Sequence, residues 1–208
     1  MFFAYHELCI DTSDTLWITQ PNHTLALYCI ADMLAIYPSH VIPSRLFIPY
    51  GPGTIRRDLA LQRTDMLPIF FRRTDGGVGI TIHNADISVN ALLDDPTRIT
   101  ATSLKVFLHL INYSPIERQI QLRTSSTSPQ SISVQRLARL VASKVCCFWR
   151  TAEAENNTIT DWNDPRWMVG PGAGRMNVGD IILLGIAFVS PGKVTPLLQV
   201  RPDFVFMQ

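Results

Sequence analysis

Charged side chains are scarce in this chain of 208 residues. They make up 17% of the sequence, against about 25% in an average globular protein. The formal net charge is only +1, which excludes strong bulk attraction to nucleic acid or to an anionic membrane. A surface with so few charges is expected to be covered in part by partner chains.

Long apolar runs and leader segments are also missing. Apolar runs reach about ten residues before a charge, Pro or Gly interrupts them, and a membrane span needs about twenty. We therefore expect no membrane partner. The first residues, MFFAYHELCID, have no basic segment and carry acids early, so they do not fit a secretory signal or a mitochondrial presequence.

Cysteine is too sparse for a disulfide framework. The adjacent pair at 146 and 147 would bridge only through a strained ring. We predict reduced thiols in a cytosolic environment, mostly buried as small hydrophobic side chains. The four residues concerned are Cys9, Cys29, Cys146 and Cys147.

Motifs for catalysis and for cofactors are incomplete. Residues 170–174, GPGAG, lack the Gly-Lys-Ser/Thr that completes a phosphate loop. His6 and Cys9 have the spacing of metal ligands, but a zinc site needs a second close pair. No Ser or Cys lies in a nucleophile motif of the Gly-x-Ser-x-Gly kind. We predict no cofactor, no metal site, no catalytic residue and no enzyme; a hydrolase triad assembled in space is the third-ranked alternative.

The clearest secondary structure is at the C-terminal end. Residues 181–189 form an apolar run of strand length, and Ser190-Pro191-Gly192-Lys193 reads as a turn. In residues 198–206 every second side chain is apolar, which predicts a strand with one buried face. We expect this last strand to lie inside the fold.

Other segments give further strand signals. Residues 66–73 and 78–89 flank Thr-Asp-Gly-Gly, which predicts a hairpin. Residues 104–112 are apolar on both faces, which predicts a strand buried on both sides, and residues 119–124 alternate with one polar face. Shorter strand signals lie at 15–19 and 45–48, and residues 24–37 fit a buried helix or a buried strand equally well.

One segment has helical spacing. Residues 134–145 place Leu137, Leu140 and Val141 on one face, with Arg136, Arg139 and Lys144 elsewhere. Many short strands and few helices predict an all-β fold, a jelly-roll β-sandwich with one or two short helices, as a single domain over residues 1–208. That fold hosts coat proteins, lectins and cupins, so it does not decide the function.

Two of these stretches resemble a known family. Residues 180–206, DIILLGIAFVSPGKVTPLLQVRPDFVF, resemble the last two jelly-roll strands of picorna-like virus coat proteins, and residues 103–113, SLKVFLHLINY, resemble an inner strand. The likeness is closest to plant viruses of the secovirus group, the comoviruses and cheraviruses. It implies a structural coat subunit of an icosahedral shell around a positive-strand RNA genome, found in the virion and, during assembly, in the host cytoplasm.

The resemblance also implies partners and processing. The partners are other coat subunits and genomic RNA. Polyproteins of this group are cut after glutamine, which suits Gln208 at one end and Met1 at the other. With no Lys or Arg before Arg45, RNA contact would come from the folded surface and be weak and salt-dependent. The candidate RNA-facing residues are Arg56, Arg57, Arg72 and Arg73, with Arg63 near them; ordinary solvated strand ends are the alternative reading.

A second function class stays open beside the coat subunit. A jelly-roll module that binds carbohydrate or another ligand, similar to a lectin, fits the same strand pattern. Self-association and ligand-dependent melting distinguish the two.

Overall fold

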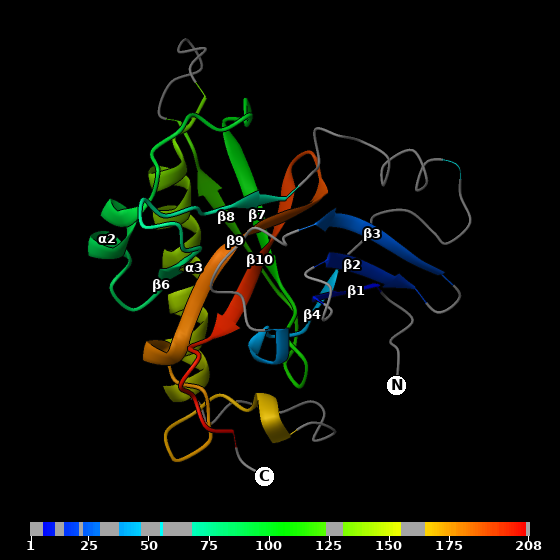
Figure 1. The fold of residues 1–208 in the computed structure, drawn as a ribbon, viewed down its shortest axis with the longest axis vertical. Helices are drawn as coiled ribbons and strands as arrows, with labels where there is room; N and C mark the ends of the chain where they lie inside the picture. Colours follow the sequence, from blue (N-terminus) through cyan, green and yellow to red (C-terminus); the bar gives the residue numbers. More distant parts are fainter. Residues whose placement is uncertain are drawn as a thin grey trace.

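The structure is a computed structural model that describes residues 6–10, 15–20, 23–29, 38–46, 55, 68–123, 131–154 and 165–206 (Figure 1). This part of the chain is rich in strands. The strands are β1 His6–Ile10, β2 Thr15–Gln20, β3 His23–Cys29, β4 Ser44–Leu46, β5 Ile69–Phe70, β6 Ile80–Thr81, β7 Ser103–Leu108, β8 Ile116–Gln121, β9 Ile181–Ser190 and β10 Lys193–Val200. The helices are α2 Ala85–Ser88 and α3 Val134–Ala154, with short 3-10 turns at Pro38–His40, Val89–Ala91, Pro165–Trp167 and Val178–Asp180.

The strands form two sheets. One has four strands in the order β3-β2-β1-β4, and the other has six, in the order β5-β9-β10-β7-β8 with β6 also paired to β9. The larger sheet is mixed, because β10 runs parallel to β7 at Lys193 and Val194. The segment before β4 joins the two sheets, since the Ile42 N–H donates to the Leu198 carbonyl at 2.9 Å. The short strands predicted at 15–19 and 45–48 are confirmed as β2 and, in part, β4, and residues 24–29 lie in β3.

The hairpin β9–β10 lies at the centre of the larger sheet. β10 is flanked by β9 and β7, and its side chains from 194 to 200 are all buried. The prediction of an interior final strand is therefore confirmed. Pro196 has no N–H to donate. Its backbone nitrogen faces away from β9, on the same side of β10 as the Leu198 carbonyl. On that side Pro196 lies between the residues of β10 that pair with β7 and the one that pairs with Ile42, so a proline is tolerated there.

The predicted end of this strand is wrong. β10 stops at Val200, and the Arg201 N–H turns to donate to the Asp180 carbonyl at 2.8 Å. Pro202, which cannot continue the ladder, then enters a turn, and Phe204 and Phe206 lie beyond the strand, half-buried. The alternation in this stretch therefore reflects packing of a non-strand segment.

The hairpin predicted from residues 66–89 is present only around its turn, where the Arg73 N–H donates to the Gly77 carbonyl at 2.8 Å and the Gly79 N–H donates to the Phe71 carbonyl at 2.7 Å. Its longer arms, β5 and β6, do not pair with each other. β5 and β6 both run antiparallel to β9, at neighbouring positions along it, so they are two pieces of one edge strand. Residues 72–78 bulge out between them, closed by an Arg72–Val78 bridge. The strand signal also ends early: after Ile82 the chain enters α2, where the Asn84 carbonyl accepts from the N–H groups of Ile87 and Ser88.

Helix α3 covers one face of the larger sheet. It begins at Val134 as predicted but continues to Ala154, a length of 21 residues, so it is not short. Its apolar stripe, including Leu137, Val141 and Trp149, is buried in the core and packs on β7, β8 and β9. Figure 1 shows the helix running along the sheet, with β1–β4 on the right of the view.

Strand β7 buries one face only. Leu104, Val106 and Leu108 are buried, whereas Lys105 is exposed and Phe107 is half-buried, so the expectation of two buried faces is wrong. In the β8 region the alternation is confirmed: Gln119 and Gln121 are exposed, and Ile120 and Leu122 are buried.

Gly185 in β9 provides a test of the central packing. A Cβ at this position would lie 2.3 Å from the Ile69 carbonyl oxygen, so the edge strand would have to move. We predict that Gly185→Ala lowers the free energy of unfolding by about 1–3 kcal/mol, measured by urea denaturation. Gly192→Ala, where a Cβ meets nothing within 4 Å, is the control and should change stability by less than about 0.5 kcal/mol. Equal effects of the two changes would contradict the tight contact between β5 and β9.

Candidate functional site

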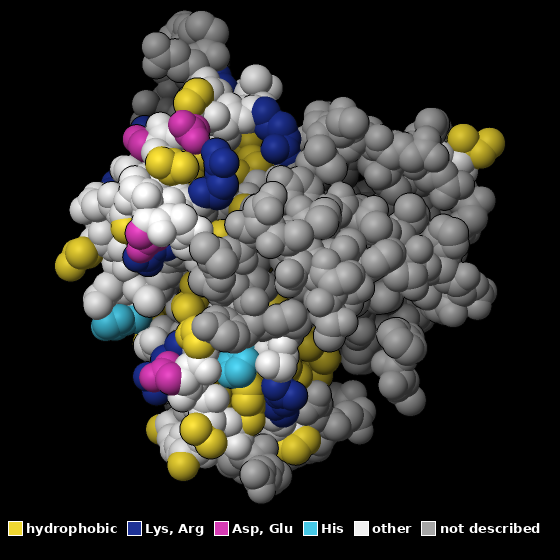
Figure 2. All heavy atoms as spheres, viewed as in Figure 1, with side chains coloured by type: hydrophobic (Ala, Val, Ile, Leu, Met, Phe, Trp, Pro, Cys, Tyr) yellow, Lys and Arg dark blue, Asp and Glu magenta, His cyan; other side chains and the backbone are white. Residues whose placement is uncertain are grey.

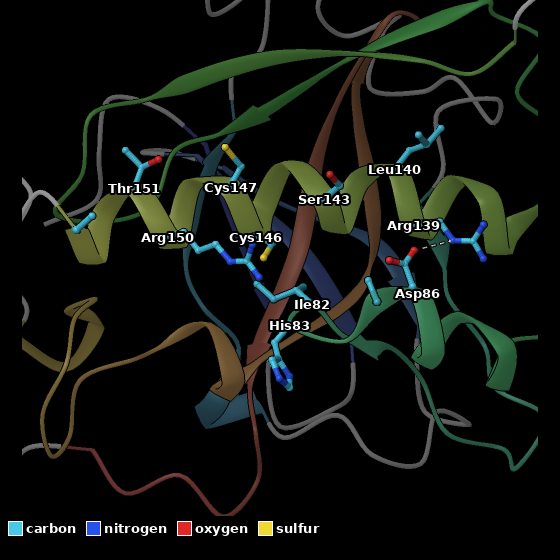
Figure 3. Close-up of a pocket in the computed structure, with 12 residues that line it drawn as sticks. Ile82, His83, Asp86, Arg139, Leu140, Ser143, Cys146, Cys147, Arg150 and Thr151 are labelled. Carbon is cyan, nitrogen blue, oxygen red and sulfur yellow. Dashed lines mark ion pairs between the residues drawn. The ribbon is translucent and has the colours of Figure 1, made fainter.

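A groove of about 780 Å³ runs along α3, beside α2 and the residues after β6 (Figure 3). Helical periodicity places every third or fourth side chain of α3 on this side. The lining residues are Ile82, His83, Ala85, Asp86, Arg139, Leu140, Ser143, Cys146, Cys147, Arg150, Thr151 and Ala154. The sequence indicated the helix, but the groove depends on α2, which the strand prediction for residues 78–89 excluded.

Cations line the solvent side of α3. Arg139 pairs with Asp86 of α2, with Nε 3.3 Å from Oδ1. Figure 3 shows the Arg150 side chain extending over Cys146 toward Ile82. Among the residues that the structure describes, Arg136, Lys144 and Arg150 pair with no carboxylate. The groove is therefore better suited to an anion than to a cation.

The two cysteines of the groove differ in environment. Cys146 is buried, and burial raises the pKa of its thiol, with Arg150 acting in the opposite direction. A raised pKa disfavours the thiolate that a nucleophile requires. Cys147 is exposed, so the expectation of buried cysteines is right for the first and wrong for the second. The side chains of Cys9 and Cys29 lie outside the described residues. The arrangement favours binding over covalent chemistry.

Two of the candidate RNA-facing arginines are held by carboxylates. They lie on or beside the loop of residues 72–78. Arg72 Nη2 lies 3.5 Å from Asp95 Oδ2, and Arg73 Nη2 lies 2.6 Å from Asp75 Oδ2. These pairs reduce the positive charge available to phosphate. Arg56, Arg57 and Arg63 lie outside the described residues, as do Met1 and Gln208.

Other surface cations have carboxylate partners too. Glu117 contacts both Lys105 and Lys193, at 2.8 and 2.6 Å, and hydrogen bonds from these two lysines lower the pKa of its carboxyl group. Arg201 pairs with Asp180 at 2.8 Å and with Asp203 at 3.2 Å. Charge on these surfaces is largely balanced.

An aromatic–arginine cluster lies beside the end of the described chain; it comprises His40, Arg166, Trp167, Phe204 and Phe206. The Arg166 guanidinium stacks 4.1 Å from the centre of the Phe206 ring, and Phe206 meets Trp167 at 5.3 Å and Phe204 at 5.0 Å between ring centres. The Arg166 guanidinium also donates to the Ser39 carbonyl. No local spacing in the sequence predicted the cluster, because it joins three separate segments.

The residues of the candidate metal and phosphate-loop motifs form no binding site in the described part of the chain. No group of three metal-ligating side chains occurs within the described ranges. Residues 170–174 form a turn with positive φ at Gly170, Gly172 and Gly174, closed by a bridge between Val169 and Met176. Within the described residues, none of the helices combines the length and the hydropathy of a membrane span.

Comparisons with protein-family models, curated proteins and solved structures find no match.

The ion pair in the loop of residues 72–78 can be tested by titration. The hydrogen bond from Arg73, with a second from the Gly77 N–H, lowers the pKa of Asp75 to about 2. At pH values above the pKa of Asp75 in the unfolded chain, the ionised carboxylate therefore contributes to the stability of the folded protein. This contribution to stability is lost as the pH falls toward 2. We predict a carboxyl titration midpoint near 2 by ¹³C NMR, returning toward the ordinary value in Arg73→Gln. A wild-type midpoint near 4 would contradict the pairing.

The cysteines of the groove provide a second test. We predict that a thiol reagent labels Cys147 within minutes, while Cys146 reacts at least about tenfold more slowly because it is buried and its thiolate is disfavoured. Peptide mapping by mass spectrometry distinguishes the two sites. Cys147→Ser should remove the fast labelling and Cys146→Ser should leave it. Fast labelling at Cys146 would show that the groove side of α3 is more open than described.

Proposed function

We propose that this chain is a structural coat subunit of a plant picorna-like virus, assembling with sister subunits into an icosahedral shell around RNA. One observation carries the proposal. The two stretches that resemble such coat proteins, 103–113 and 180–206, are far apart in the sequence but adjacent in the sheet, where β7 pairs with β10.

The surface supports an assembling protein. Ile87 and Val205 are 73% and 80% exposed, and Figure 2 shows Lys and Arg in small groups, with hydrophobic side chains between them. Aromatic residues and arginine are enriched at protein interfaces and supply much of their binding energy. The aromatic–arginine cluster, with Val205 projecting beside it, is therefore our candidate contact between subunits.

A jelly roll is the finer fold that the proposal implies. Neighbouring strands of a jelly roll are antiparallel, whereas β10 and β7 run parallel. In a sandwich a second sheet faces the first, whereas α3 covers one face of the larger sheet. The proposal of a coat subunit therefore rests on the resemblance, on the adjacency of the two similar stretches and on the surfaces, and the sheet departs from jelly-roll topology at these two points.

Self-association of the purified chain tests the proposal. We predict concentration-dependent oligomers at micromolar protein, detected by sedimentation velocity, and shell-like particles by electron microscopy when sister coat subunits are co-expressed. Val205→Asp places a charge on the exposed end of the cluster and should raise the association midpoint at least about tenfold, equivalent to about 1.4 kcal/mol. Thr100→Asp, at an exposed polar residue outside the cluster, is the matched control.

A stable monomer at all concentrations would contradict the coat proposal. A melting temperature that rises with added saccharide would instead favour the carbohydrate-binding alternative. Equal effects of Val205→Asp and Thr100→Asp would show that contacts between subunits lie elsewhere.

A further inference from the structure

The solvent side of α3 carries an excess of positive charge. Four cations, Arg136, Arg139, Lys144 and Arg150, lie on this helix, whose only acidic residue is Glu153. The two carboxylates on this side are already engaged: Asp86 pairs with Arg139, and Glu153 accepts from the Val178 N–H at 2.9 Å. This contrasts with Arg72, Arg73 and Arg201, each of which has a carboxylate partner.

The cations are arranged along a line. Successive residues of a helix rotate by about 100° and rise by about 1.5 Å. Arg136, Arg139 and Arg150 therefore lie within about 60° of one another over about 21 Å of axis. Lys144, which is half-buried, is rotated by about 80° from Arg136 and about 120° from Arg150 and lies at the edge of this row. All three arginines are exposed. Such a row fits a polyanion with repeated charges better than a single small anion.

The floor of the groove favours a phosphate backbone over a peptide. Small side chains, including Ala85, Ser143 and Ala154, line much of it. A peptide partner needs deep apolar pockets for its anchor side chains, and the half-buried Leu140 offers little of this. Phosphates need only cations and hydrogen-bond donors in reach.

We propose that the solvent side of α3 is the surface on which single-stranded RNA docks, through phosphate contacts with Arg136, Lys144 and Arg150. Arg139 joins them when it is released from Asp86. The inference rests on the proposed coat function, which supplies RNA as a partner, and it moves the RNA-facing surface from Arg72 and Arg73 to the helix. Binding through so few phosphates is weak, independent of sequence and sensitive to salt.

Binding of a fluorescent 20-nucleotide oligouridylate, followed by anisotropy over a salt series, tests the proposal. The triple variant Arg136→Gln/Lys144→Gln/Arg150→Gln should bind at least about tenfold more weakly at low salt. Its slope of log K against log salt should be shallower by about 2, since each phosphate contact to a single strand contributes about 0.7. Circular dichroism should show an unchanged fold and melting temperature.

Two further variants sharpen the test. The control Arg72→Gln/Lys105→Gln/Arg118→Gln removes the same number of charges from other exposed positions and should change the slope by less than about 0.7, less than one phosphate contact. Asp86→Asn frees Arg139 and should strengthen binding several-fold. An equal loss in the control triple, or no gain in Asp86→Asn, would overturn the assignment to α3.

Other outcomes separate this inference from the coat proposal. Poly-glutamate is a competitor that represents an acidic protein. If it displaces RNA from the unchanged chain at a lower concentration than unlabelled oligouridylate does, and loses this ability with the α3 triple variant, the occupant is an acidic protein and the proposal is overturned. RNA-free particles from the α3 triple variant would support it. If particles of the unchanged chain and of the α3 triple variant contain equal amounts of RNA, the RNA surface on α3 is refuted and the coat function is not. If the chain binds RNA through α3 but forms no particles, the coat function is refuted and the RNA surface is not.

Discussion

The enclosure of β10 is the constraint on which the rest of the structure depends. The strand pairs with β9 on one side and with β7 and the Ile42 segment on the other, and side chains on both of its faces are buried. On the face toward α3, Val194 and Val200 are 0% exposed; on the opposite face, Thr195 and Gln199 are 0% and 1% exposed. No hydrogen-bond partner of the Thr195 hydroxyl is found in the described structure, an arrangement that costs about 1–3 kcal/mol. The stabilisation from burying the surrounding apolar side chains must exceed that cost.

The same helix serves the core and the candidate site. Its apolar stripe, with Leu137 and Trp149 fully buried, packs α3 against the sheet, and the exposed side chains of the helix lie outside this contact. Arg136 and Arg150 can therefore be changed with little effect on folding, whereas Leu137 cannot. The Asp180–Arg201 pair plays the corresponding part at the end of the hairpin: it links the start of β9 to the residue after β10 and directs the chain toward the aromatic–arginine cluster.

Local patterns predicted the elements whose signal lies within one segment. The β9–β10 hairpin and the start of α3 could be read from period and turn residues alone. The edge strand could not, because only the register of β5 and β6 on β9 shows that they are one interrupted strand. The site was missed for the same reason: the cations of α3 were visible in the sequence, but which arginines have carboxylate partners depends on contacts such as Arg72 with Asp95. The alternation of apolar residues up to Phe206 predicted too long a strand, because half-buried aromatic side chains outside a strand can have the same spacing.

Hydrogen–deuterium exchange of the purified chain tests the central claim most directly. Amides of β9 and β10 should exchange most slowly, at rates governed by global unfolding, because their hydrogen bonds lie between other strands and both faces of β10 are covered. The β8 amides, in a strand whose side chains at 117–119 are exposed, should exchange much faster. Slow exchange in α3 together with fast exchange throughout β10 would contradict an organisation of this fold around its last strand.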